Sequence, residues 1–250
     1  MSAAVLPGAE PASFPGGPSG ALVLHGFTGS PQSMRGLAEA FAAAGFAVEL
    51  PRLPGHGTSV EDMAQTTWDD WSAEAEAAYR RLAARCEKLV VAGLSMGGAL
   101  SVWLAARHPE IAGVAVINGA FQPFDAAVRA VFEQARADGV ERMPAVAGDI
   151  AAEGVVELAY DAVPTVSAHS LIDALDALQP ELAKIRCPVL IFNSPQDHVV
   201  APESSDHLAA RVAGPVERVS LARSYHVATL DHDREEIERR AVDFAQRVTR

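Results

Sequence analysis

The chain has 250 residues, of which 49% are hydrophobic and 21% are charged, and its formal net charge is −12. This composition is typical of a globular protein and excludes a disordered chain, and the length suits one large domain or a core with an insertion. The negative charge disfavours nucleic acid and anionic membrane surfaces as partners.

The cysteines and the N-terminal residues bear on the cellular compartment. Cys86 and Cys187 could form one disulfide, but we expect free thiols in the core, and no pair of Cys or His residues has a zinc-type spacing. Residues 1–20 hold no basic residue and no long apolar run, so we expect no signal peptide and a cytoplasmic location. At most a short strand near Val5 and Leu6 is predicted there.

Apolar segments alternate with segments of helical periodicity along most of the chain. Strands are predicted at 21–25, 46–50, 89–92, 111–118, 188–192 and 216–221, and helices at 32–44, 68–85, 99–106 and 235–248. Strands that are apolar on both faces and separated by helices are typical of parallel sheets covered on each side. The predicted fold class is therefore α/β, with a mostly parallel central sheet and helices on both faces.

The alternation breaks between Asn118 and Pro188, where 69 residues intervene. A simple crossover between parallel strands needs only about a dozen residues. The clearest helical pattern in this insertion is the apolar series Leu171, Leu175, Leu178 and Leu182. We expect residues 120–184 to form a helical cap, or lid, over a site in a core made of residues 1–119 and 185–250.

The most informative stretch is Gly93-Leu94-Ser95-Met96-Gly97, a G-x-S-x-G sequence between a predicted strand and a predicted helix. In that setting the motif places a nucleophilic serine on a sharp turn. The turn leaves no room for a Cβ atom two residues to either side of the serine, so both positions are glycine. Three alternatives compete: a chance match, a phosphate-binding loop, which would need a following Lys-Ser/Thr, and a membrane span over 89–106, which the central glycines would interrupt.

A nucleophilic serine needs a histidine base and an acid that orients it, and in this fold class they follow the serine in the order acid, then histidine. Asp197 follows the 188–192 strand, and His226 follows the last predicted strand. Asp197 could instead be a turn aspartate that caps its own backbone, with Asp206 as the second candidate acid. His226 could be a loop histidine that makes one hydrogen bond.

An oxyanion hole requires two backbone donors near the serine. The residue after the nucleophile, Met96, supplies one N–H, and the loop after the first strand is expected to supply the other from Phe27. We expect the nearby His25 to hold this loop by hydrogen bonds.

Several segments together resemble the α/β-hydrolase superfamily, and specifically the bacterial monoacylglycerol lipases and related carboxylesterases. They are LHGFTGSPQSMR, LPRLPGHGT, AGLSMGG, VVELAYD, QDHVV and SYHVATLDHD, and the similarity extends from about Val5 to the closing helix. The resemblance implies hydrolysis of monoacylglycerol, a small lipid ester, to glycerol and a fatty acid without a cofactor. It also implies a nucleophile at Ser95, an acid at Asp197, a base at His226, and oxyanion donors at Phe27 and Met96.

In that family a glutamate of the cap contacts the glycerol group, and the matching position here is Glu157. Without the resemblance, Glu157 would be interpreted as a solvated helix carboxylate. The cap departs most from the family pattern in the acidic, alanine-rich stretch 130–153. That departure leaves acyl-chain preference open.

Two other functions remain as alternatives. A general carboxylesterase that prefers short acyl esters would use the same three residues, and a binding protein on a hydrolase scaffold would carry an inactive site. Epoxide or haloalkane hydrolysis would require a carboxylate at position 95. The sequence leaves open whether the protein is a monomer or a homodimer.

Overall fold

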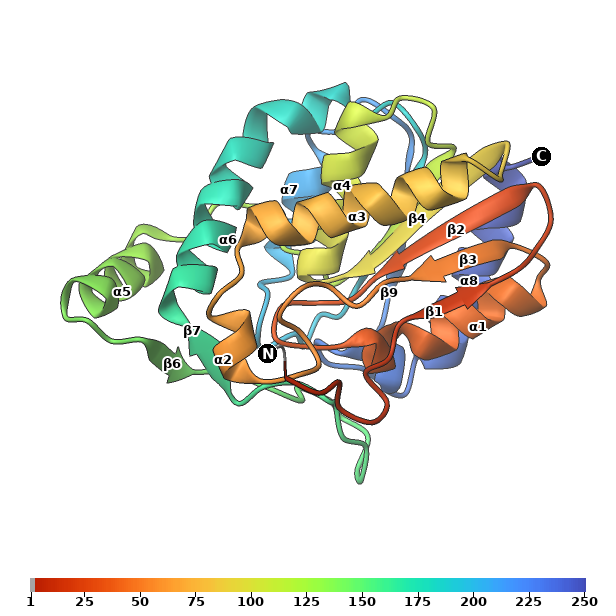
Figure 1. The fold of residues 1–250 in the computed structure, drawn as a ribbon. Coiled ribbons are helices and arrows are strands. Elements are labelled where there is room, and N and C mark those ends of the chain that lie inside the picture. Colours follow the sequence, from red (N-terminus) through yellow and green to blue (C-terminus); the bar gives the residue numbers. More distant parts are fainter. Residues whose placement is uncertain (1–2) are drawn as a thin grey trace.

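The computed structural model describes residues 3–250 and is built around a seven-stranded sheet (Figure 1). The strand order is β1-β3-β2-β4-β5-β8-β9, in which β1 is antiparallel to β3 and every other neighbouring pair is parallel. The strands are β1 (Ala12–Phe14), β2 (Ser19–Leu24), β3 (Ala47–Leu50), β4 (Lys88–Leu94), β5 (Gly113–Ile117), β8 (Val189–Asn193) and β9 (Val216–Ser220).

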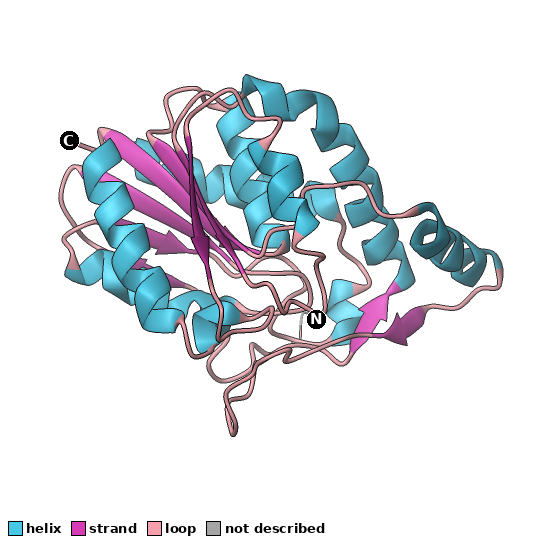
Figure 2. Cartoon of the chain, turned by 180° about the vertical axis from the view of Figure 1, so that it is seen from behind, coloured by secondary structure: helices cyan, strands magenta, loops and turns pink. Residues whose placement is uncertain are grey.

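Helices cover both faces of this sheet, as the sequence predicts (Figure 2). One face packs against α1 (Arg35–Ala43) and α8 (Arg234–Val248), and the other packs against α3 (Trp68–Ala83), α4 (Met96–Arg107) and α7 (Glu203–Ala209). Strand β2 shows why: Leu22 and Leu24 belong to one apolar core, whereas Ala21 and Val23 belong to the other. Burial on both faces explains the continuous apolar character of the strand sequences.

The insertion between β5 and β8 contains α5 (Ala126–Ala137), β6 (Arg142–Pro144), β7 (Ala162–Pro164), α6 (Thr165–Leu178) and the 3-10 helix η2 (Gln179–Lys184). Helix α6 packs on the core through Leu171, Leu175 and Leu178, whereas α5 projects from the body of the molecule (Figure 1). Strands β6 and β7 form a separate two-stranded antiparallel sheet.

Shorter helices complete the chain: η1 (Pro31–Met34), α2 (Val60–Met63) and η3 (Ala228–Leu230). The predicted helix at 32–44 is divided between η1 and α1 and ends, as expected, before Gly45, whose φ is +92°. The strand predicted near Val5 and Leu6 is wrong, because the N-terminal strand is β1, which pairs along the outer edge of β3. An edge strand of three residues is too short to show an apolar period in the sequence.

None of the helices in residues 3–250 combines the length and the hydropathy needed to cross a membrane.

Candidate active site

Ser95 lies on the turn between β4 and α4, in a strained backbone conformation. Its φ is 54° and its ψ is −118°, a backbone conformation that residues other than glycine rarely adopt. The turn is fixed on both sides, because the Ser95 N–H donates to the Ile117 carbonyl at 3.0 Å and the Ser95 carbonyl accepts from the Gly98 N–H at 2.9 Å. The hydroxyl is therefore presented at the carboxyl end of the sheet.

The two flanking glycines are required by close backbone contacts. A Cβ on Gly93 would lie 2.1 Å from the Gly97 carbonyl oxygen, and a Cβ on Gly97 would lie 2.2 Å from the Leu24 carbonyl oxygen. Both distances are far below van der Waals contact. The G-x-S-x-G spacing thus reflects the packing of the turn against β2 and against itself.

Asp197 and His226 are brought together from the loops after β8 and β9. The Nδ1 atom of His226 lies 2.8 Å from Oδ2 of Asp197, and the two side chains are 8% and 2% exposed. The other carboxylate oxygen, Oδ1, accepts the N–H groups of Val199 and Val200, each at 2.8 Å. A carboxylate held this way accepts a hydrogen bond from Nδ1–H, and the lone pair on Nε2 of the imidazole is then the acceptor for a proton.

Ser95 and His226 line the same cavity, of about 450 Å³. Within residues 3–250 the Ser95 hydroxyl makes no hydrogen bond to the His226 ring. A serine hydroxyl changes rotamer readily, and catalytic hydrogen bonds are often long before substrate binds. The structure thus brings the two side chains to one cavity without a hydrogen bond between them.

The two expected oxyanion donors also line this cavity. Neither the Phe27 N–H nor the Met96 N–H donates to an acceptor elsewhere in the part of the chain that the structure describes. Met96 is the first residue of α4, where a helix leaves N–H groups free and favours negative charge. The Phe27 loop passes so close that a Cβ on Gly26 would lie 3.3 Å from Cβ of Ser95.

His25 holds the Phe27 loop, as expected from the sequence. Its Nδ1–H donates to the Gly26 carbonyl at 2.9 Å, and its Nε2 accepts the Leu53 N–H at 3.1 Å. Burial, aided by the neighbouring His56, lowers the pKa of His25 to about 3, so the ring is neutral at physiological pH. The Phe27 ring packs edge-on against Trp71 with centroids 5.4 Å apart. Hydrogen bonds and an aromatic contact thus hold this loop on both sides of Gly26.

The cap supplies most of the apolar wall of the cavity. Its apolar lining residues include Val128 and Phe132 of α5 and Leu171, Ile172 and Leu175 of α6. Leu171 and Leu175 belong to the apolar helical series that the sequence predicts in the insertion. A wall of this kind suits an acyl chain.

Glu157 also lines the cavity, but it does not lie on a helix. Its Oε2 accepts the Gly148 N–H at 3.1 Å, and its Oε1 faces Gly29, at 3.2 Å from where a Cβ of that glycine would lie. Burial raises the pKa of Glu157. The alternative of a solvated helix carboxylate is wrong, because Glu157 lies in irregular chain and its partly buried carboxylate contacts the Gly148 N–H and faces Gly29.

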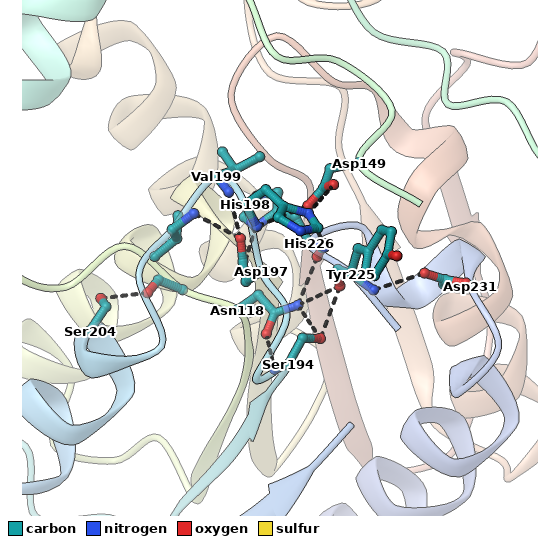
Figure 3. A network of polar contacts seen from close by, with 12 residues as sticks. Asn118, Asp149, Ser194, Asp197, His198, Val199, Ser204, Tyr225, His226 and Asp231 are labelled. Atoms are coloured by element: carbon teal, nitrogen blue, oxygen red, sulfur yellow. Dashed lines mark hydrogen bonds and ion pairs between the residues drawn. The ribbon is translucent and has the colours of Figure 1, made fainter. Parts of the chain in front are cut away.

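Asn118, Asp149 and Asp231 make contacts in the site that the sequence did not predict (Figure 3). The Asn118 amide donates to the carbonyls of Tyr225 and His226 at 3.1 and 2.8 Å and accepts the Ser194 N–H at 2.7 Å. Its position directly after β5 is a signal that could have been used. No comparable signal marks Asp149, since it meets the base loop only through the fold of the cap.

No group of three or more His, Cys, Asp or Glu side chains in residues 3–250 is arranged to hold a metal ion. Cys86 and Cys187 are both free thiols.

A strained serine turn, an acid and a histidine after later strands, and a cap inserted into a parallel sheet define a class of protein, the serine hydrolases of the α/β-hydrolase superfamily. The family model described as "Serine aminopeptidase, S33" (Hydrolase_4) matches residues 19–233, and the chain belongs to this family. Within it, the chain is one of the bacterial monoacylglycerol lipases and their relatives, which confirms the resemblance seen in the sequence.

Two sequence relatives are similar to the chain over almost its whole length. The chain is 44% identical to the "Thermostable monoacylglycerol lipase" of Bacillus sp. (strain H-257), over 96% of this chain and 95% of that protein. It is 24% identical to a "Carboxylesterase" of Bacillus subtilis (strain 168), over 96% of this chain and 97% of that protein.

Solved structures agree with this assignment. A structure reported for the metagenome-derived lipolytic enzymes LipS and LipT matches with a TM-score of 0.93 and 45% identity, over 98% of this chain and all of that chain. The monoacylglycerol lipase of Paleococcus ferrophilus matches with a TM-score of 0.77 and 20% identity, over 96% of this chain and 98% of that chain, which supports the shared fold.

Proposed function

We propose that the protein is a serine ester hydrolase that cleaves monoacylglycerols to glycerol and a free fatty acid through an acyl-enzyme at Ser95. The observation that carries this proposal is the buried hydrogen bond between Asp197 and His226 at a cavity that also contains Ser95. The relative of Bacillus sp. named as a monoacylglycerol lipase supports the choice of substrate.

In the first half of the reaction, the Ser95 hydroxyl attacks the ester carbonyl and His226 accepts its proton at Nε2. Asp197 keeps the imidazole in the correct tautomer and stabilises the imidazolium that forms. The N–H groups of Phe27 and Met96 bind the developing oxyanion. Loss of one such donor typically lowers kcat by about 10²–10³-fold.

In the second half, His226 returns its proton to the glycerol oxygen, so the C–O bond breaks and glycerol leaves. A water molecule then attacks the acyl-enzyme while the same imidazole accepts its proton. The imidazolium returns that proton to Oγ of Ser95 as the bond between Oγ and the acyl carbon breaks, so the fatty acid departs and the Ser95 hydroxyl is restored. The chain's own residues account for every proton transfer in this scheme.

Residues 120–184 form the lid in this proposal, and two regions of it select the substrate. Glu157 accepts a hydrogen bond from a glycerol hydroxyl, which the direction of its carboxylate toward the cavity supports. The apolar side chains of α5 and α6 enclose the acyl chain. Glycerol recognition and acyl recognition thus come from different parts of the insertion.

A general carboxylesterase preferring short- to medium-chain acyl esters is the second candidate. The Bacillus subtilis relative named as a carboxylesterase supports it, and the same three residues would carry the chemistry. The two candidates differ in whether the glycerol group and a long acyl chain improve kcat/KM.

The test is a series of monoacylglycerols from butyryl to stearoyl, with diacylglycerol, triacylglycerol and a simple butyrate ester as comparisons. We expect kcat/KM to be highest for a monoacylglycerol and Ser95→Ala to abolish turnover and labelling by a fluorophosphonate probe. Ser101→Ala is the control, because Ser101 lies on α4, the helix that follows Ser95, and its hydroxyl bonds only the Gly97 carbonyl. Turnover by Ser95→Ala would refute the nucleophile, and equal rates on simple esters would favour the carboxylesterase.

We also propose that the protein works in the cytoplasm. The free thiols of Cys86 and Cys187 support this, because disulfides are rare in that compartment.

A further inference from the structure

We propose that Asp149, a residue of the cap, is a positioning residue for the Asp197–His226 pair. This inference rests on the proposed function, because it assumes that His226 is the base. Its basis is a set of hydrogen bonds by which one cap carboxylate holds both the loop of the acid and the loop of the base (Figure 3).

The contacts of Asp149 are few and specific. Its Oδ2 accepts two backbone N–H groups, that of His198 at 3.1 Å and that of His226 at 3.0 Å. Its Oδ1 lies 2.8 Å from Nδ1 of the His198 ring, and its own carbonyl accepts the Val227 N–H at 3.0 Å. The side chain is only 10% exposed.

These contacts fix the residues on either side of the acid–base hydrogen bond. His198 directly follows Asp197 in the chain, so one oxygen atom of Asp149 holds the backbones of both loops in a common register. An imidazole displaced by about 1 Å loses much of its catalytic effect, at a cost of about 10²-fold. Asn118 holds the His226 carbonyl from the core side, and Asp149 holds its N–H from the cap side.

Asp149 is ionised when it does this. Burial opposes the charge, but the hydrogen bonds from the ring and backbone of His198 and from the His226 N–H outweigh it and lower the pKa of Asp149. An ionised carboxylate accepts hydrogen bonds on both oxygens without donating any. Asparagine keeps one such oxygen, and alanine keeps none.

The same turn of the cap also reaches the candidate glycerol-binding residue. Gly148, the neighbour of Asp149, donates its N–H to Oε2 of Glu157 at 3.1 Å. Two consecutive cap residues therefore connect Glu157 with the base loop. The cap is thereby part of the catalytic geometry as well as a cover for the acyl chain.

The experiment compares Asp149→Ala and Asp149→Asn with Gln32→Ala in the full-length protein. Gln32 is the matched control, because it also fastens the cap to the core, accepting the Leu158 N–H and donating to the Val156 carbonyl, but touches neither Asp197 nor His226. Each variant is assayed for kcat and KM on a monoacylglycerol, for the rate of labelling by a small dialkyl fluorophosphate, and for Tm.

We expect Asp149→Ala to lower kcat and the labelling rate by about 10- to 100-fold, with KM changed by less than about threefold. Asp149→Asn should recover both to within about fivefold of the parent, because its one carbonyl oxygen can still accept the two N–H groups. Gln32→Ala should label at the parent rate. The fluorophosphate is too small to need the cap walls, so its labelling rate reports on Ser95, His226 and Asp197.

A labelling rate for Asp149→Ala within about twofold of the parent would overturn the proposal, as would an equal loss in Gln32→Ala, which would mean general anchoring of the cap. If Asp149→Ala fails to fold, Asp149→Ser takes its place with the same two outcomes, because its shorter hydroxyl cannot accept both N–H groups. Failure of the proposed function gives a different result: the parent protein would not be labelled at Ser95, or Ser95→Ala would still turn over substrate.

Discussion

The residues of the site are held mainly by backbone contacts, and the serine turn shows this most clearly. Gly97 brings the start of α4 against the end of β2, so closely that a Cβ there would lie 2.2 Å from the Leu24 carbonyl oxygen and 2.7 Å from that of His25. Those carbonyls belong to the strand end and loop that lead to Phe27. Any side chain at position 97 would therefore push the oxyanion loop away from Ser95.

Gly97→Ala is expected to abolish ester hydrolysis and to lower the free energy of unfolding by about 3 kcal/mol or more, because rigid backbone must move. Gly45→Ala is the control: Gly45 has a φ of +92° but no atom within 4 Å of an added Cβ. Backbone strain alone should cost it about 1 kcal/mol. Urea denaturation measures both losses, and equal losses would contradict the steric explanation.

Two buried histidines make the folded state sensitive to acid. Burial is the largest cause that lowers the pKa of His25 to about 3 and that of His56 to about 4, from an ordinary value of 6.5. Below pH 6.5 the unfolded chain therefore binds more protons than the folded chain. Stability is fully present above that pH and is lost as the pH falls toward 4.

We expect the free energy of unfolding to fall by a few kcal/mol between about pH 7 and pH 4.5 through these two groups. Urea denaturation across that pH range should show a shallower decline of the free energy of unfolding for His56→Gln. This variant should be less stable than the parent at pH 7, because it loses the hydrogen bond from Nδ1–H to the Pro54 carbonyl. An unchanged slope in His56→Gln would show that other groups control the acid sensitivity.

At the scale of helices and strands, the sequence predicted the core closely and the cap poorly. The strands that became β2, β4, β5 and β8 are buried on both faces, so their apolar runs and the helical periodicity between them marked their positions. Within the cap, β6 and β7 have three residues each, too few to show a period, and α5 has no buried residue, so no contact with the core determines its place.

The candidate site likewise has residues that the sequence predicts and contacts that it does not. Ser95, Asp197 and His226 follow strands in a known chain order, so their chemistry can be predicted from the sequence. Asp149 meets His226 across 77 residues of chain through a cap whose path the sequence does not specify. Contacts of that kind require the three-dimensional structure.

Helix α5 is the element held least firmly. No residue from 122 to 163 is fully buried, and α5 is attached mainly by Arg129 to Asp176 at 2.6 Å and by the Phe132 carbonyl, which lies 2.9 Å from Nε2 of His169. Segments with few buried contacts open at low free-energy cost. Helix α5 is therefore expected to open before any core element.

Limited trypsin digestion should first cut after Arg136, which is exposed near the end of α5. The nicked protein should keep its activity on an acetate ester and lose activity on a long-chain monoacylglycerol, because Val128 and Phe132 of α5 line the cavity. Mass spectrometry of early fragments identifies the site. A first cut within the core, or equal loss on both esters, would contradict this order of stability.

At the scale of the whole molecule, charge favours a neutral substrate. The chain carries a net charge of −12, and the charged residues lining the cavity are Asp125, Asp149 and Glu157, with no Lys or Arg among the lining residues that the structure describes. An anionic headgroup would be repelled by these carboxylates. A neutral glycerol group would not.

A monoacylglycerol should therefore be hydrolysed with a kcat/KM about 10-fold or more above that of the same lipid bearing a phosphate on its glycerol. Added salt should narrow the difference by screening the carboxylates. Steady-state rates on the matched pair at low and high ionic strength test this, with both lipids below the concentration at which they form micelles. Equal rates at low salt would be inconsistent with electrostatic selection.

The uneven attachment of the insertion has a consequence for how such enzymes diversify. The part of the insertion around residues 156–160 is joined to the core by Gln32 and by Tyr160, whose hydroxyl accepts the Thr58 N–H. Residues 122–146, which include α5 and β6, contain no fully buried residue. Residues 122–146 can therefore change in evolution, and with them the range of fatty acids that an enzyme accepts, while the ester-cleaving residues are inherited unaltered. A chimera that takes residues 122–146 from a relative should inherit the donor's chain-length range.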